Sequence, residues 1–139
     1  MQRVTISLFV ILIMMSPTVL AANEDVLVEP VLRVGDISIN KGNPLNLVVN
    51  YDLKDNQLYV ECQLSGFSFG QNEVGSLHQE NEGHLRIYLN DEHIATLFER
   101  AFYLKNLPIG EHEVLVQVVQ NDHTPYKGVG EVIAISIRE

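Results

Sequence analysis

Apolar and polar residues alternate with a period of two along most of the chain. Five segments carry this pattern most clearly, with apolar side chains on one parity and polar or mixed side chains on the other: residues 45–53, 58–64, 85–89, 113–118 and 132–137. Because successive side chains of a strand point to opposite faces, each segment is predicted to be a β-strand with one buried face. Residues 26–39 are expected to add one or two strands, interrupted at Pro30 and Gly35.

Turn-forming residues separate these segments at positions 41–44, 54–56, 90–92 and 108–110. The Asn-Asp-Glu turn at 90–92 is short enough to join residues 85–89 and 93–98 as a hairpin. Many short strands without a strong helix signal predict an all-β fold: a single antiparallel immunoglobulin-like β-sandwich of about seven or eight strands, with a barrel as the alternative. The least regular segment, 66–83, is predicted to be a long loop, and long loops in compact domains are often functional.

The first 21 residues have the features of an export signal. Arg3 supplies a positive charge, residues 6–15 form an almost wholly apolar run, and the small residue Ala21 follows. This arrangement is typical of a signal peptide cleaved after Ala21, with Ala22 as the nearby alternative. The apolar run is shorter than the roughly 20 residues that a membrane-spanning helix needs. We therefore expect a signal peptide over residues 1–21, one β-sandwich domain over residues 22–139, a periplasmic or secreted location, and no membrane insertion after cleavage.

Charge and cysteine content narrow the possible functions. The chain has 9 Lys and Arg against 18 Asp and Glu, a formal net charge of −9, which disfavours nucleic acid as a partner. A single cysteine, Cys62, excludes an internal disulfide. It shares its strand parity with Val60 and Leu64, so we expect a buried thiol without a nucleophilic role.

Several motifs from Tyr59 onward resemble those of secreted bacterial immunoglobulin-like β-sandwich domains, a group that is itself largely uncharacterised. The matching pieces are Gly-Phe-Ser-Phe at 66–69, Glu-Gly-His-Leu-Arg-Ile-Tyr at 82–88, Phe-Tyr-Leu at 102–104, Leu-Pro-Ile-Gly-Glu-His-Glu-Val at 107–114 and Asn-Asp-His at 121–123. In that group the second piece usually reads G-H-x-H, and an aromatic residue followed by His usually occupies the third. Here Arg86 stands where the second His of G-H-x-H would be. Tyr103 and Leu104 stand where the third piece would carry its aromatic residue and His.

The resemblance implies a metal site that this chain retains only in part. His84, Asp122 and His123 are the candidate ligands, because imidazole and carboxylate groups bind copper or zinc. The alternative follows from the residue types alone: Asp122 and His123 could instead hydrogen-bond the backbone of a turn. His112, which shares its parity with Val114, is expected to pack partly buried at a strand edge.

Arg86, Tyr88 and Tyr103 are the candidate ligand-binding residues at the same motif positions. Arg86 could hold an anionic small ligand. An ion pair with Asp122 or Glu82, or a solvated position on the outer face of its strand, is favoured over ligand binding.

Patterns that would indicate catalysis are missing from the sequence. It has no G-x-S-x-G elbow, no H-E-x-x-H, no phosphate-binding loop and no G-x-G-x-x-G. We therefore expect no enzyme activity and no required cofactor. The favoured function is an exported binding or accessory domain, a protein-interaction module that uses segment 66–83 or an open sheet edge. The alternative is a periplasmic copper- or zinc-binding accessory protein with a residual histidine site.

Overall fold

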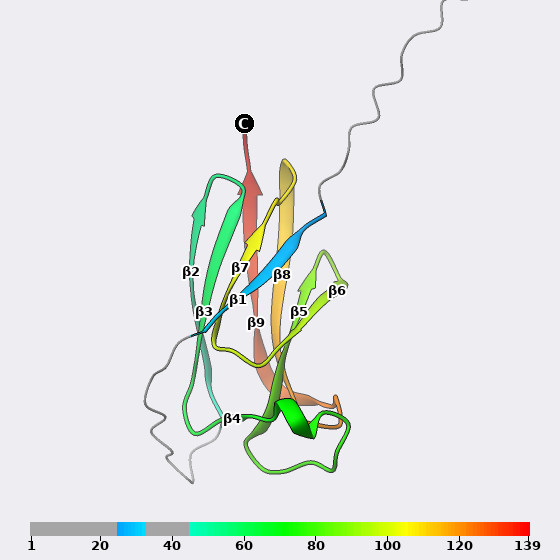
Figure 1. Cartoon of the computed structure of the whole chain (residues 1–139). Coiled ribbons are helices and arrows are strands. Elements are labelled where there is room, and N and C mark those ends of the chain that lie inside the picture. Colours follow the sequence, from blue (N-terminus) through cyan, green and yellow to red (C-terminus); the bar gives the residue numbers. More distant parts are fainter. Residues whose placement is uncertain (1–24, 33–44) are drawn as a thin grey trace, which may run out of the picture.

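The computed structural model describes residues 25–32 and 45–139, and within these ranges the chain is built from strands (Figure 1). The elements are β1 (Leu27–Val31), β2 (Leu47–Lys54), β3 (Gln57–Leu64), β4 (Ser68–Phe69), the 3-10 turn η1 (Gln71–Glu73), β5 (Glu82–Leu89), β6 (Glu92–Leu97), β7 (Ala101–Lys105), β8 (Gly110–Val119) and β9 (Pro125–Ile137). The predicted signal peptide at 1–21 and the expected strand after Gly35 lie outside the described residues. No helix within those ranges has the length and apolar character needed to span a membrane.

The strands form two sheets that pack against each other. One sheet has the order β1-β7-β3-β2, and the other has the order β4-β5-β8-β9 with β6 also paired to β5. Neighbouring strands are antiparallel, except for the two-residue parallel pairing of β4 with β5. The orders β2-β3-β7 and β5-β8-β9 match strands A-B-E and C-F-G of an immunoglobulin-like sandwich. The predicted fold is therefore confirmed, and the described strands form two open sheets rather than a barrel.

The core lies between the facing sheets and follows the predicted alternation. Its fully buried members include Leu58, Val60, Leu85, Ile87, Phe102, Leu104, Val114, Val116 and Val118, with Ile133, Ile135 and Ile137 closing it from β9. Cys62 is also in this core, as expected, with a relative exposure of 1%. Burial of each such aliphatic side chain stabilises the fold by about 1.5–3 kcal/mol.

The predicted hairpin between β5 and β6 is present. Its two loop residues, Asn90 and Asp91, have φ values of 50° and 69°. Left-handed backbone at both central positions is the requirement of a type I′ turn, whose twist matches that of the flanking strands. Asn and Asp tolerate this conformation better than most residues, so the local sequence explains the turn.

An imidazole closes the connection between β7 and β8. His112 Nε2 lies 2.8 Å from the carbonyl oxygen of Pro108, and its Nδ1 lies 3.1 Å from Asn90 Nδ2. With the proton on Nε2, the ring donates to Pro108 and accepts from Asn90, so one tautomer satisfies both contacts. Immunoglobulin-like domains commonly place a tyrosine hydroxyl in this role near the start of the equivalent strand. His112 therefore joins two loops, beyond the edge packing expected from its parity.

Two details differ from the sequence-based expectations. Pro30 lies inside β1 rather than interrupting it, because β1 pairs with β7 alone among the described strands and an edge strand tolerates a missing N–H. Segment 66–83 is not an unbroken loop, since it contains β4 and η1. Backbone bonds from Ser68 N to Asn81 O (2.9 Å) and from Gly70 N to Gly83 O (3.0 Å) hold its two ends together.

Candidate functional site

The candidate metal ligand His84 lies on β5, on the sheet face opposite the core. Leu85 and Ile87 point into the core, so His84, Arg86 and Tyr88 share the outer face. His84 is nevertheless completely buried. The rings of His123 and Phe98 cover it, with ring centroids 5.2 Å and 5.6 Å from that of His84.

The structure brings His84 and His123 into direct contact. His84 Nε2 lies 3.3 Å from His123 Nδ1, within hydrogen-bonding distance. His123 belongs to the tight turn between β8 and β9 and has a left-handed φ of 70°. Bonds from His123 N to Gln120 O (2.9 Å) and from Gln120 N to Thr124 O (2.8 Å) close this turn. The turn therefore places the exposed imidazole of His123 over the buried one.

Burial lowers the pKa of His84 from 6.5 to about 4, because the charged imidazole loses its hydration in this position. Positive charge on His123, Arg86 and His93 adds smaller repulsive contributions in the same direction. His84 is therefore neutral at pH 7. Its Nδ1 is buried and has no hydrogen-bond partner.

Asp122 lies next to His123 but is engaged in the turn. Its Oδ1 accepts a hydrogen bond from Thr124 N at 2.9 Å, and this bond holds the pKa of the exposed carboxyl below its usual value. No group of three or more His, Cys, Asp and Glu side chains that could hold a metal ion occurs in the described part of the chain. The geometry therefore joins two of the three candidate metal ligands and assigns the third to backbone capping, which was the alternative expected from its residue type.

The candidate ligand-binding residues do not converge. Arg86 and Tyr88 lie on β5, whereas Tyr103 lies on β7 in the other sheet. The ring of Tyr88 contacts that of His93, with centroids 5.3 Å apart, and the buried Nε of Arg86 has no hydrogen-bond partner.

The ion pair considered for Arg86 does not form. Glu82 Oε1 instead accepts from Asn121 Nδ2 at 2.9 Å, and Asp122 is bound to Thr124. Arg86 faces Gln117 on β8 and Thr96 on β6 across the sheet.

A buried amide beside the histidine pair was not recognised from the sequence. Asn121 is fully buried; its side-chain Nδ2 donates to Glu82, its backbone carbonyl oxygen accepts from Gly75 N at 2.6 Å, and its side-chain Oδ1 has no hydrogen-bond partner. A Cβ placed on Gly70 would lie 2.8 Å from Asn121 Oδ1, so the backbone of segment 66–83 packs directly against this side chain. The Asn-Asp dipeptide indicated a turn, but nothing local showed that its Asn would anchor a distant segment.

Segment 66–83 is fixed at its base and exposed at its tip. Tyr126 on β9 donates its hydroxyl to Glu82 O at 2.8 Å, and its ring contacts that of His78 at a centroid distance of 5.6 Å. The tip carries Val74 and Leu77, with relative exposures of 41% and 89%. Two apolar side chains are thus presented to solvent from a backbone held by buried polar contacts. Figure 1 shows this segment and the β8–β9 turn at one end of the sandwich, with the C-terminus at the other.

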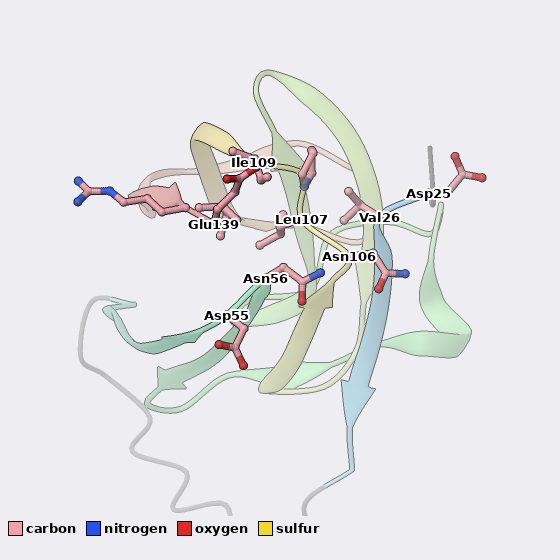
Figure 2. Close-up of a pocket in the computed structure, with 11 residues that line it drawn as sticks. Asp25, Val26, Asp55, Asn56, Asn106, Leu107, Ile109 and Glu139 are labelled. Carbon is pink, nitrogen blue, oxygen red and sulfur yellow. The ribbon is translucent and has the colours of Figure 1, made fainter. Parts of the chain in front are cut away.

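Two hollows lie toward that other end. The larger has a volume of about 790 Å³ and is bordered by the β2–β3 turn and the β7–β8 loop, including Asp55, Asn56 and Asn106 (Figure 2). The smaller has a volume of about 380 Å³ and is lined by Asp52, Lys54, Asp55, Gln57, Tyr59 and Tyr103. Neither includes a residue of the histidine pair.

Comparison with known proteins gives weak structural similarity and no sequence match. No protein-family model matches the sequence, and no curated protein matches it. Among solved structures, the chain is similar to the fibronectin(III)-like modules of Clostridium thermocellum CbhA, with a TM-score of 0.41 and 13% sequence identity. The alignment covers 68% of this chain and 48% of that one, so this chain spans about half the length of the structure it matches. The assignment of an immunoglobulin-like sandwich rests on the sheet order described above.

Proposed function

We propose that this chain is an exported, non-enzymatic binding module, periplasmic or secreted, that contacts a protein partner through the tip of segment 66–83. The observation that carries the proposal is the pairing of a fixed base with an apolar tip. Asn121, Glu82 and Tyr126 hold the segment, while Leu77 remains 89% exposed. A preordered loop loses less conformational freedom on binding than a flexible one, which favours recognition by this segment.

The chemistry of the tip favours a protein surface with an apolar recess. Burial of an exposed Leu side chain contributes about 1.5–3 kcal/mol, which corresponds to roughly a tenfold to hundredfold gain in affinity. Exposed acidic residues Glu73 and Glu80 flank the tip, so a complementary partner would carry basic groups around the recess.

The test uses substitutions that leave the base of the segment intact. A photo-reactive residue at position 77 would identify the partner in cells that make the protein naturally, and calorimetry would then measure its affinity for purified variants. We expect V74S/L77S to weaken binding at least about tenfold, because two apolar contacts are removed. The matched control is V132S, since Val132 is 52% exposed on β9. Equal affinities of V74S/L77S and the parent protein would contradict the proposal.

Metal binding by the histidine pair is the alternative function, and one distance favours it. Two nitrogen ligands of a tetrahedral zinc ion, each about 2.0–2.1 Å from the metal, lie about 3.3 Å apart. His84 Nε2 and His123 Nδ1 have this separation of 3.3 Å, and neutral His84 has a lone pair available at pH 7. Two side chains leave the coordination incomplete, so Asp122, water or a partner would have to supply further ligands.

The metal alternative is tested by titrating purified protein with Zn(II), Cu(II) and Cu(I). The expected result is binding by the parent protein that falls at least about tenfold in H123Q, with the exposed His78 replaced in the control H78Q. Binding that is no tighter than about 1 mM, or that is unaffected by H123Q, would contradict this alternative.

A further inference from the structure

Two tyrosines form an aromatic pair on the outer face of the four-stranded sheet, far from the segment proposed to bind protein. In the strand register, Tyr59 on β3 is paired with Asp52 on β2 and with Tyr103 on β7, and Tyr103 is paired with Glu29 on β1. The four side chains therefore form one row across the sheet, in the order Asp52, Tyr59, Tyr103, Glu29. Neighbouring positions of opposite parity, such as Leu58 and Leu104, are in the core.

The orientation of this pair is defined by its surroundings. The ring centroids of Tyr59 and Tyr103 are 5.1 Å apart, with an interplanar angle of 49°. Lys105 Nζ lies 5.6 Å from the centroid of the Tyr103 ring and also forms an ion pair with Glu29. Both tyrosines are half-buried, so one part of each ring packs on the sheet and another part borders solvent.

The rings line one side of the smaller hollow, and hydrogen-bonding groups line the rest. Its volume of about 380 Å³ lies within the range of small-molecule sites. The other lining residues, Asp52, Lys54, Asp55 and Gln57, all carry side chains that can form hydrogen bonds. Asp55 also borders the larger hollow, where Figure 2 shows it beside Asn56, so the two hollows share a lining residue at the β2–β3 turn.

We propose that this face is a binding site for a neutral glycan chain. A sugar ring offers an apolar C–H face that packs on an aromatic ring, while its hydroxyl groups donate and accept hydrogen bonds at the edge. The residues that line the hollow supply both: two tyrosines, and Asp, Gln and Lys side chains. The adjoining hollow, with further amides at Asn56 and Asn106, would accommodate additional sugar units of the same chain.

Charge and apolar content argue against other ligands at this face. Two carboxylates against one ammonium group in the lining disfavour a polyanion such as nucleic acid or an acidic polysaccharide. No Val, Leu, Ile, Met or Phe side chain lines the smaller hollow, so an apolar peptide side chain would gain little by entering it. Tyr103, which the sequence indicated as a ligand-binding residue, is thus placed with Tyr59 rather than with Arg86 and Tyr88.

The test measures binding of three neutral hexasaccharides, cellohexaose, xylohexaose and chitohexaose, to residues 22–139 by calorimetry and by backbone amide NMR shifts. We expect at least one to bind with a Kd below about 1 mM and to shift the amide signals of Tyr59 and Tyr103. Y103A should weaken that binding at least about tenfold, whereas Y103F, which keeps the ring, should remain within about threefold of the parent protein. The matched control is Y51A, because Tyr51 is 54% exposed and does not line the hollow.

A second variant, Q57A, tests the proposal independently in case Y103A does not fold. Gln57 is exposed at the rim, so Q57A should fold normally and weaken binding about threefold to tenfold through loss of hydrogen bonds. Failure of all three sugars to bind below about 1 mM would overturn the proposal, as would equal effects of Q57A and Y51A. The V74S/L77S variant should bind the glycan like the parent protein, so the two proposals fail independently.

Discussion

The buried imidazole of His84 should make the protein less stable as the pH is lowered, over the range between its unfolded and folded pKa values. The pKa of His84 is about 4 in the folded protein and 6.5 as an ordinary imidazole. Because the folded pKa lies below the unfolded one, the neutral ring stabilises the fold fully above pH 6.5. That contribution is lost as the pH falls from about 6.5 toward about 4. The perturbation we propose is H84Q, which keeps a polar side chain facing His123 but cannot take up a proton.

The magnitude follows from the difference between the two pKa values. A shift of about 2.5 pKa units corresponds to about 3 kcal/mol when the titration is complete. Integrating the linkage relation gives a loss of about 1.4 kcal/mol at pH 5.5 and about 2.5 kcal/mol at pH 4.5. These values are upper bounds, because solvent around the exposed His123 that covers His84 screens part of the charge. Such a loss is a large fraction of the 5–15 kcal/mol typical of a small domain.

The assay is urea unfolding of metal-free protein at pH 7.5, 6.5, 5.5 and 4.5, in the presence of a chelator. H84Q is expected to be less stable than the parent protein at pH 7.5, because the packing against Phe98 is altered. The difference in free energy of unfolding between the parent protein and H84Q should shrink by about 2.5 kcal/mol at pH 4.5, because only the parent protein is destabilised by protonation of His84. H78Q is the control, because His78 is exposed on segment 66–83 and should leave the slope unchanged.

A pH-independent difference between the parent protein and H84Q would refute this reasoning. An NMR titration gives an independent check, because the His84 ring protons should shift with a midpoint near pH 4. A midpoint at or above pH 6 would show that water reaches the ring in solution, so that desolvation does not control its charge.

Three further predictions concern single residues of the fold. G83A should lower the free energy of unfolding by at least about 3 kcal/mol, or prevent folding, because the new Cβ would lie 1.9 Å from the carbonyl oxygen of Val119. Circular dichroism melting would test this, and a variant as stable as the parent protein would contradict the close approach. Burial raises the pKa of Cys62 to about 12, so a thiol reagent at pH 8 should modify it only after denaturant is added, and rapid labelling of native protein would be inconsistent with its burial. N121A should lower stability by about 1–3 kcal/mol, because the buried side-chain bond from Asn121 to Glu82 is lost; urea unfolding would measure this, and unchanged stability would argue against the anchor.

The period-two pattern was sufficient to predict the sandwich and much of its core. Leu85 and Ile87 alternate with polar residues and face inward, and the Asn-Asp pair forms the hairpin turn predicted for it, with a left-handed backbone at both residues. Pairings between distant strands were beyond this reasoning. Period two fixes which face a side chain occupies, but not which strand lies beside it, so Tyr59 and Tyr103 could not be recognised as neighbours.

The candidate site was predicted in part for the same reason. His84 and His123 meet because β5 and β8 are adjacent and the turn after β8 folds back over the sheet. The motif indicated these two residues, but their contact depends on the left-handed backbone of His123. The burial of Asn121 was missed because an Asn in a turn is ordinarily exposed, and its partners lie about forty residues away in the sequence.

The turn between β8 and β9 connects the two candidate functions at this end of the molecule. Asn121 holds segment 66–83 through Gly75 and Glu82, and His123, two residues later, covers His84. A metal ion held by His84 and His123 would therefore be bound through the same tight turn that anchors segment 66–83. Any effect of metal binding on the affinity of the loop tip for a partner would be matched, by linkage, by an equal effect of the partner on metal affinity. The aromatic face that includes Tyr103 lies in the other sheet and shares none of these contacts, so it should respond to neither event.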